Sequence, residues 1–163
     1  MIRLFLFAAV CLLSTENLAL AQTYDERLRG LTSLGFLVDG VDEASKNCGI
    51  TESTVRDAFM YVAISANFKI TTTDSWGPQF VVRIITMIQN RPVQCISAVS
   101  IQVGNQQVTL DYGDSLSPWV WVGLWRDEWL GVSIVENHSK QITTAIEDMT
   151  KKFVTAWNLA NKS

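Results

Sequence analysis

The sequence predicts an α+β fold, a two-layer sandwich in which two helices pack on one face of a mainly antiparallel four- or five-stranded sheet. Three observations predict it. Apolar residues recur at helical spacing in residues 51–66 and 137–159, and a β-branched and aromatic stretch fills residues 80–125. One cysteine also lies just before the first helix and another within that stretch, so a disulfide could connect them. The expected order of elements is β-α-β-β-β-β-α.

The chain begins with the pattern of a secretory signal peptide. Arg3 precedes an apolar run over residues 4–13, and Ala-Leu-Ala at positions 19–21 places small residues where a signal peptidase reads the chain. The run is about ten residues long, whereas a membrane-spanning helix needs roughly 20. We therefore expect residues 1–21 to be a cleaved signal peptide.

A lipoprotein signal acylated at Cys11 is the rival interpretation, but Val10 is too large for the position before such a cysteine. No other stretch resembles a membrane span, so none is expected after signal cleavage. The sequence contains no internal repeat or low-complexity tract that would mark a domain boundary. Residues 22–163 are then expected to form a single α+β domain, periplasmic or secreted.

The composition is that of a globular domain. Hydrophobic residues make up 48% of the chain and charged residues 18%, which disfavours disorder. The net charge is −3, and the sequence contains no basic run or stripe. Both features argue against nucleic acid as a partner.

Two cysteines remain after signal cleavage, Cys48 and Cys95. An even number in an exported protein favours a disulfide, which would stabilise the fold by about 4 kcal/mol by closing a long loop. A redox-active or metal-binding pair is the alternative. The sequence has no Cys-x-x-Cys motif and one histidine, which disfavours it.

The first half of the domain is expected to hold two strands around one helix. An apolar run within residues 31–41 predicts the first strand, and alternation in residues 68–72 predicts the second. Thr51 is a good N-cap for the intervening helix, which should end at Ala66. The apolar face of that helix consists of Val55, Ala58, Phe59, Val62, Ala63 and Ala66.

The middle of the chain predicts the sheet. Residues 80–88 and 93–103 are rich in β-branched side chains and predict two strands. The second is expected to extend to residue 110 past a β-bulge at Gly104, with a Gly104-Asn105 hairpin turn as the alternative.

Residues 119–125 predict a further strand, followed by a charged tip at residues 126–128. Alternation would place Trp119, Trp121 and Trp125 on one face of it. Three indoles on one face are candidates for ligand binding, by stacking on sugar rings or by contacting a partner protein. Packing against the core is the structural alternative.

Residues 129–135 fit neither a strand nor a helix clearly. A long helix is then expected from Asn137 or Ser139 to about Leu159. Its apolar stripe consists of Ile142, Ala145, Ile146, Met149, Phe153, Ala156, Trp157 and Ala160.

Several of these segments together resemble a set of uncharacterised bacterial exported proteins of small α+β fold. The shared features are Cys-Gly-Ile-Thr-Glu at residues 48–52 before a helix, a second cysteine opening a long strand, a strand around Trp125, and Ile-Glu-Asp-Met-Thr-Lys-Lys-Phe-Val at residues 146–154. The resemblance covers residues 31–161. The implied layout is similar to the N-terminal α/β domain of TolB, by element order. Neither likeness implies a catalytic residue.

The sequence offers few groups for catalysis. His138 lacks the strained nucleophile turn of a Ser-His-Asp enzyme, and we interpret it as a solvated residue at the start of the last helix. Asp111 with Asp114, or Asp127 with Glu128, would supply the paired carboxylates of a hydrolase, but turns contain such pairs by chance. We find no phosphate-binding glycine loop and no metal-ligand spacing.

We therefore expect an exported, non-catalytic binding module of the bacterial envelope that uses no cofactor and no metal. Its partner is expected to be an envelope protein or a second copy of the chain, bound through an exposed sheet face. A glycan- or cell-wall-binding domain that uses the tryptophan face is the first alternative. A carboxylate-dependent hydrolase is the second.

Overall fold

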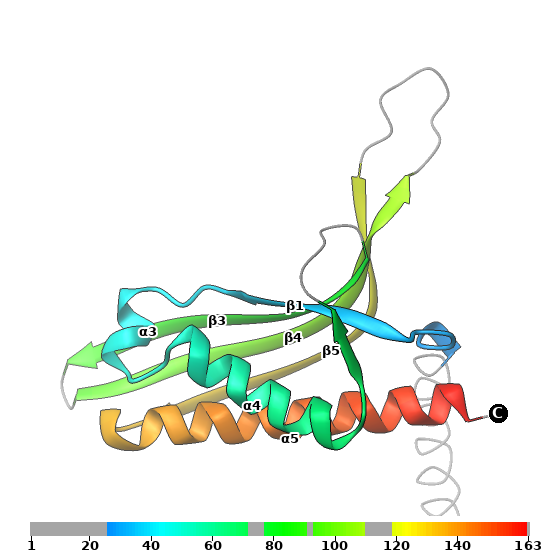
Figure 1. The fold of residues 1–163 in the computed structure, drawn as a ribbon. Helices are drawn as coiled ribbons and strands as arrows, with labels where there is room; N and C mark the ends of the chain where they lie inside the picture. The colour runs from blue at the N-terminus through cyan, green and yellow to red at the C-terminus, as the bar shows by residue number, and fades with distance from the viewer. Residues whose placement is uncertain (1–25, 72–76, 91–92, 110–118, 163) are drawn as a thin grey trace, which may run out of the picture.

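The computed structural model in Figure 1 describes residues 26–71, 77–90, 93–109 and 119–162, and shows an α+β fold. The signal-peptide prediction lies outside these residues. Five strands and three helices follow one another in this order: β1 (Ser33–Asp39), α3 (Glu43–Asn47), α4 (Glu52–Ser65), β2 (Lys69–Thr71), β3 (Pro78–Asn90), β4 (Val93–Thr109), β5 (Trp119–Ser133) and α5 (Val135–Asn161).

The sheet is mixed, which corrects the expectation of a mainly antiparallel one. Its strand order is β2-β1-β3-β4-β5. β1 lies parallel to both of its neighbours, whereas β3, β4 and β5 are antiparallel. Because α3 and α4 connect β1 to β2, the chain returns to the end of the sheet where β1 began. A second strand that starts from that end pairs in parallel.

The three long strands carry most of the sheet. β3 pairs with β4 from Pro78 opposite Asn105 to Asn90 opposite Val93. β4 continues to Thr109, so the prediction of one long strand is confirmed, but the predicted bulge at Gly104 is wrong, because the extra residue at this register shift belongs to β5. The predicted charged tip at residues 126–128 is wrong, because β5 passes through it as regular strand.

α4 begins at the predicted cap. The Thr51 hydroxyl accepts a hydrogen bond from the Thr54 amide at 3.2 Å, and the Thr54 hydroxyl accepts one from the Thr51 amide at 3.1 Å. This reciprocal box satisfies two amides that have no helical carbonyl partner. Asn67 follows the helix with φ of 54°, a left-handed conformation typical of a helix C-terminus.

Aromatic rings join both long helices to the same part of the sheet. Phe59 of α4 lies 4.3 Å from Phe36 and 4.4 Å from Phe80, between ring centroids. Phe153 of α5 lies 5.5 Å from Phe80 and 5.5 Å from Trp125. Since Phe59 and Phe153 both contact Phe80, they lie against one face of β3, and Figure 1 shows both helices below the sheet. We call this the helix face.

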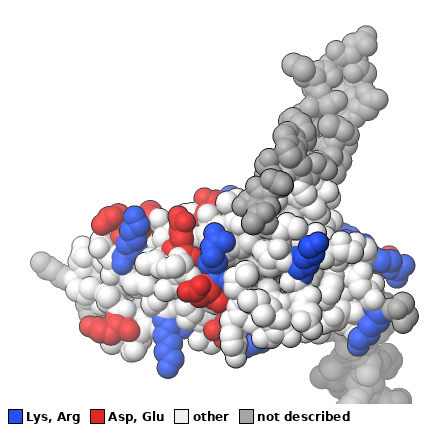
Figure 2. Space-filling model, viewed as in Figure 1, with Lys and Arg blue, Asp and Glu red and all other residues white. Residues whose placement is uncertain are grey.

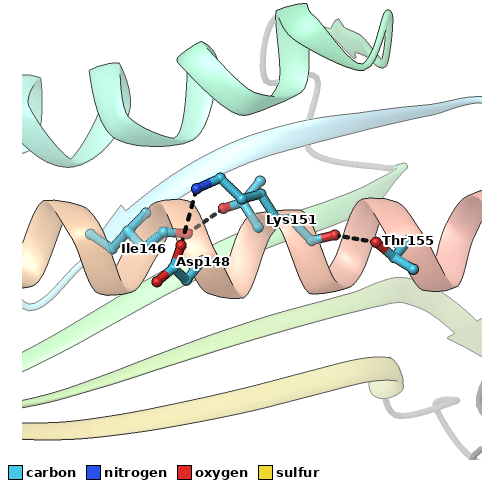
Figure 3. A network of polar contacts seen from close by, with 5 residues as sticks. Ile146, Asp148, Lys151 and Thr155 are labelled. Carbon is cyan, nitrogen blue, oxygen red and sulfur yellow. Dashed lines mark hydrogen bonds and ion pairs between the residues drawn. The ribbon is translucent and has the colours of Figure 1, made fainter.

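α5 satisfies several of its own polar groups (Figure 3). The Lys151 ammonium donates to Asp148 at 3.0 Å, and the Thr155 hydroxyl donates to the Lys151 carbonyl at 2.9 Å. The buried Thr150 hydroxyl donates to the Ile146 carbonyl at 2.7 Å. These contacts leave the helix free to present its apolar stripe to the sheet.

The predicted disulfide is confirmed. Cys48 and Cys95 are bonded, with 6.0 Å between their Cα atoms, and both are fully buried. The bond joins the loop between α3 and α4 to the beginning of β4. It therefore fastens the first helical segment to the middle of the sheet.

Candidate functional site

Within the described residues, no helix covers the sheet face opposite α4 and α5; we call it the open face. Along β3, Phe80, Val82 and Ile84 are buried, whereas Ile85 and Met87 are exposed. Side chains of a strand alternate between the two faces, so the exposed set shares one face. That face carries no helix in Figure 1.

Four apolar side chains on this face of β3 and β5 are exposed to solvent. They are Ile85 (61% exposed), Met87 (61%), Leu130 (71%) and Val132 (50%). We name these four residues the open-face patch. Large apolar side chains that gather on one exposed surface usually mark an interaction site.

The strand register shows that the open-face patch is contiguous. Ile85 lies opposite Ala98 of β4, and Ala98 lies opposite Leu130 of β5. The next row in the same direction runs from Met87 through Ile96 to Val132. Neighbouring strands are about 4.8 Å apart, so the two rows form one apolar surface across three strands.

A polar border adjoins the open-face patch. Arg83 donates to the Asp39 carboxylate at 2.8 Å, and Arg126 forms an ion pair with Glu128. A shallow hollow of about 530 Å³ spans this border and the patch; its lining includes Arg83, Ile85, Ala98, Ser100, Gln102, Arg126, Glu128 and Leu130. An apolar centre with a polar rim is the usual composition of a protein–protein interface.

The tryptophan candidates do not form one platform. Trp125 is 8% exposed on the helix face, where it contacts Phe153. Trp121 is half-buried, and its indole occupies the space that a side chain on Gly104 would fill. Gly104 follows the buried Val103 and so faces the open side. Trp121 and Trp125 therefore lie on opposite faces.

An irregularity in β5 explains this difference from the expectation. Val103 pairs with Trp125, but Gly104 pairs with Gly123, so Leu124 is an extra residue in β5. A β-bulge of this kind reverses the alternation beyond it. The side chain of Trp119 lies outside the described residues.

His138 is buried, which corrects its interpretation as a solvated residue. Its Nε2 lies 2.8 Å from the Ser97 hydroxyl, and its Nδ1 lies 2.8 Å from the Ser133 hydroxyl. The chain of hydroxyls continues through Thr86, 2.8 Å from Ser97, to Ser45, 3.0 Å from Thr86. β5 and α5 are joined by so short a connection that the first turn of α5 faces the sheet. Burial lowers the pKa of His138.

This hydroxyl network does not have the access that catalysis needs. His138, Ser97 and Ser45 are each 0% exposed, so no substrate reaches them in this conformation. Each ring nitrogen of His138 is already occupied by a serine hydroxyl. We therefore assign the network to the packing of α5 against β4 and β5.

The carboxylate pairs do not converge in the described part of the chain. Asp127 lies on the helix face, where its Oδ2 accepts from Lys152 at 2.8 Å. Glu128 is the next residue along the strand and faces the open side, beside Arg126. Asp111 and Asp114 lie outside the described residues. Among residues that the structure describes, no group of three acidic, histidine or cysteine side chains is placed to hold a metal ion.

On the side of the molecule seen in Figure 2, acidic side chains lie mainly over the left half, basic side chains lie over both halves, and wide uncharged areas separate them. No helix within the described ranges has an apolar stretch long enough to cross a bilayer. Comparisons with protein-family models, curated proteins and solved structures found no match to this chain.

Proposed function

We propose that this chain is an exported, non-catalytic interaction module of the bacterial envelope, and that it binds a partner protein through the open-face patch. The observation that carries the proposal is the contiguous surface of Ile85, Met87, Leu130 and Val132, each at least half exposed. Placing that surface in an apolar interface stabilises a complex, at roughly 25 cal/mol per Å² of apolar area removed from water.

Two observations support export. The first residues follow the pattern of a signal peptide. The Cys48–Cys95 disulfide is compatible with an oxidising compartment such as the periplasm, because such bonds are rare in the reducing cytosol. A partner in the same compartment would be an envelope protein.

The geometry favours protein binding over the glycan alternative. Stacking on a sugar requires an aromatic ring with an accessible face. Trp125 packs against Phe153 in the core, so the three-ring platform loses one member. The open-face patch instead consists of aliphatic side chains and methionine, which suit contact with another apolar protein surface.

The test is capture from an envelope extract with a matched pair of variants. Ile85→Asp places a charge in the open-face patch, where the side chain is 61% exposed. Ile64→Asp makes the same substitution on α4, where the side chain is 65% exposed. We expect the wild-type protein and I64D to retain a common partner that I85D loses. Recovery of the same partner by I85D would rule out the proposed surface.

A further inference from the structure

The outer edge of β5 is a second unpartnered surface. β5 is the last strand in the sheet order and is 15 residues long. Its inner edge pairs with β4, and within the described residues no strand pairs with its outer edge. A long free edge presents unpaired amides and carbonyls that can pair with another strand.

The sequence of this edge is self-complementary. Residues 122–132 are Val-Gly-Leu-Trp-Arg-Asp-Glu-Trp-Leu-Gly-Val, which reads the same from either end except at the two positions beside the centre. The centre is Asp127, and the two unlike positions are Arg126 and Glu128. If two copies of β5 lie antiparallel about a two-fold axis at Asp127, Arg126 of each copy lies opposite Glu128 of the other.

The side-chain positions on the open face fit this pairing. Arg126 and Glu128 lie on the same face of β5 and form an ion pair, with both side chains 58% exposed. Two copies would bring four charges together in alternating order. Opposite charges directly across an antiparallel pair are favourable.

The helix face also tolerates the pairing. The axis would bring the two copies of Asp127 together, and like charges opposite one another are unfavourable. Each Asp127, however, already accepts from Lys152 of its own chain at 2.8 Å. The two-fold axis would therefore bring together two Asp127 carboxylates and two Lys152 ammonium groups, a second cluster with two charges of each sign.

Space for a second strand is present beside this edge. A groove of about 780 Å³ lies between β5 and α5, with Trp129 and Met149 among its apolar lining. Its polar lining comes largely from α5: Asn137, Lys140, Gln141, Thr144, Asp148 and Lys152. Trp129 would lie opposite Trp125 of the second copy along this groove. The bulge at Leu124 limits regular pairing to residues 125–129 of each chain.

We propose that this chain forms a two-fold dimer by antiparallel pairing of the β5 edges, centred on Asp127. The occupant of the edge is a second copy because the palindrome complements itself, including its one charged pair. The dimer joins two sheets and places both open-face patches on the same side. It uses the strand edge, whereas the proposed function uses the sheet face, so either proposal can fail without the other.

Charge reversal tests both the edge and its register. We expect wild-type protein to sediment as a dimer whose fraction rises with concentration. R126E alone and E128R alone each place like charges opposite one another, and each should weaken dimerisation by about tenfold or more. An equimolar mixture of R126E and E128R should recover dimers, because every such pair is then of opposite sign. The double variant R126E/E128R should dimerise alone for the same reason.

Three controls accompany the experiment. D57R and K46E change the net charge by the same amounts at exposed helix positions, and should leave dimerisation unchanged. I85D alters the open-face patch away from the edge, and should also leave it unchanged. Circular dichroism checks that each variant is folded. Wild-type protein that stays monomeric, single variants that dimerise normally, or a mixture that fails to recover would each overturn the proposal.

Discussion

At the scale of single residues, His138 shows how a polar group is accommodated in this core. The ring is fully buried and both nitrogens lie 2.8 Å from serine hydroxyls, Ser97 on one side and Ser133 on the other. Neither partner is charged, so no anion in hydrogen-bond contact offsets the cost of burying an imidazolium ion. Burial accordingly lowers the pKa of His138 from its ordinary value.

This lowered pKa predicts acid sensitivity. Between the pKa of the folded state and the ordinary value of 6.5, the unfolded protein binds a proton that the folded protein does not. The free energy of unfolding should therefore fall as the pH drops below about 6.5, by at most about 1.4 kcal/mol per pH unit. Urea titrations between neutral pH and pH 5 measure this slope.

A variant isolates the contribution of the imidazole. His138→Gln keeps two polar groups for the serines but does not titrate, so the slope attributed to His138 should be absent. The variant will be less stable at neutral pH if the amide fits the network less well. An unchanged slope in H138Q would assign the acid sensitivity to other groups.

The sequence predicted some residue roles and missed others for physical reasons. Thr51 could be identified as a helix N-cap because a cap depends on local residue spacing. The Cys48–Cys95 disulfide could be predicted because only two cysteines remain after signal cleavage. The burial of His138 could not be predicted, since its position in the first turn of a helix is usually solvated. Only the short connection between β5 and α5 turns that position toward the sheet.

At the scale of elements, the aromatic contacts of Phe59 help to hold α4 against the sheet. Phe59 is 1% exposed and its ring contacts those of both Phe36 and Phe80. Phe59→Ala should lower the free energy of unfolding by about 3–5 kcal/mol, because it removes a buried ring and leaves a cavity. Chemical denaturation measures this loss.

The matched control is on the same helix. Ile64 is 65% exposed, so Ile64→Ala should change stability by no more than about 0.5 kcal/mol. If F59A proved as mild as I64A, α4 would not be held by the aromatic cluster.

The elements themselves were predictable where the pattern is periodic. The helix after Thr51 and the length of β4 follow from apolar spacing. β5 was expected to end at residue 125 because three consecutive charged residues resemble a turn. In the structure Arg126 and Glu128 face solvent while Asp127 pairs with Lys152, so the strand continues. The mixed sheet was not predicted because strand direction depends on how the connections between strands run. The spacing of apolar residues gives no information on that.

At the scale of the whole molecule, the disulfide ties separate parts of the chain together. Cys48 and Cys95 are 47 residues apart in sequence. In the chain-entropy description, removing a disulfide that closes a loop of this length lowers the free energy of unfolding by about 4 kcal/mol. The double variant C48A/C95A should therefore unfold at a clearly lower temperature than the wild-type protein, as calorimetry would measure.

Reduction provides a second form of this experiment. Adding a thiol reductant should lower the melting temperature of the wild-type protein and leave that of C48A/C95A unchanged. Equal melting temperatures for the oxidised and reduced wild-type protein would show that the bond contributes little to stability.

The two surfaces of the sheet give the molecule its overall organisation. Helices cover one face, the disulfide and the aromatic cluster hold them there, and the opposite face exposes Ile85, Met87 and Leu130. We propose that this uncovered apolar surface binds a protein.

Calorimetric titration with the captured partner, once purified, measures whether the open-face patch binds it. We expect wild-type protein and I64D to bind the partner with the same dissociation constant, and I85D to bind it at least tenfold more weakly. Equal affinities for I85D and I64D would show that the open-face patch lies outside the binding surface.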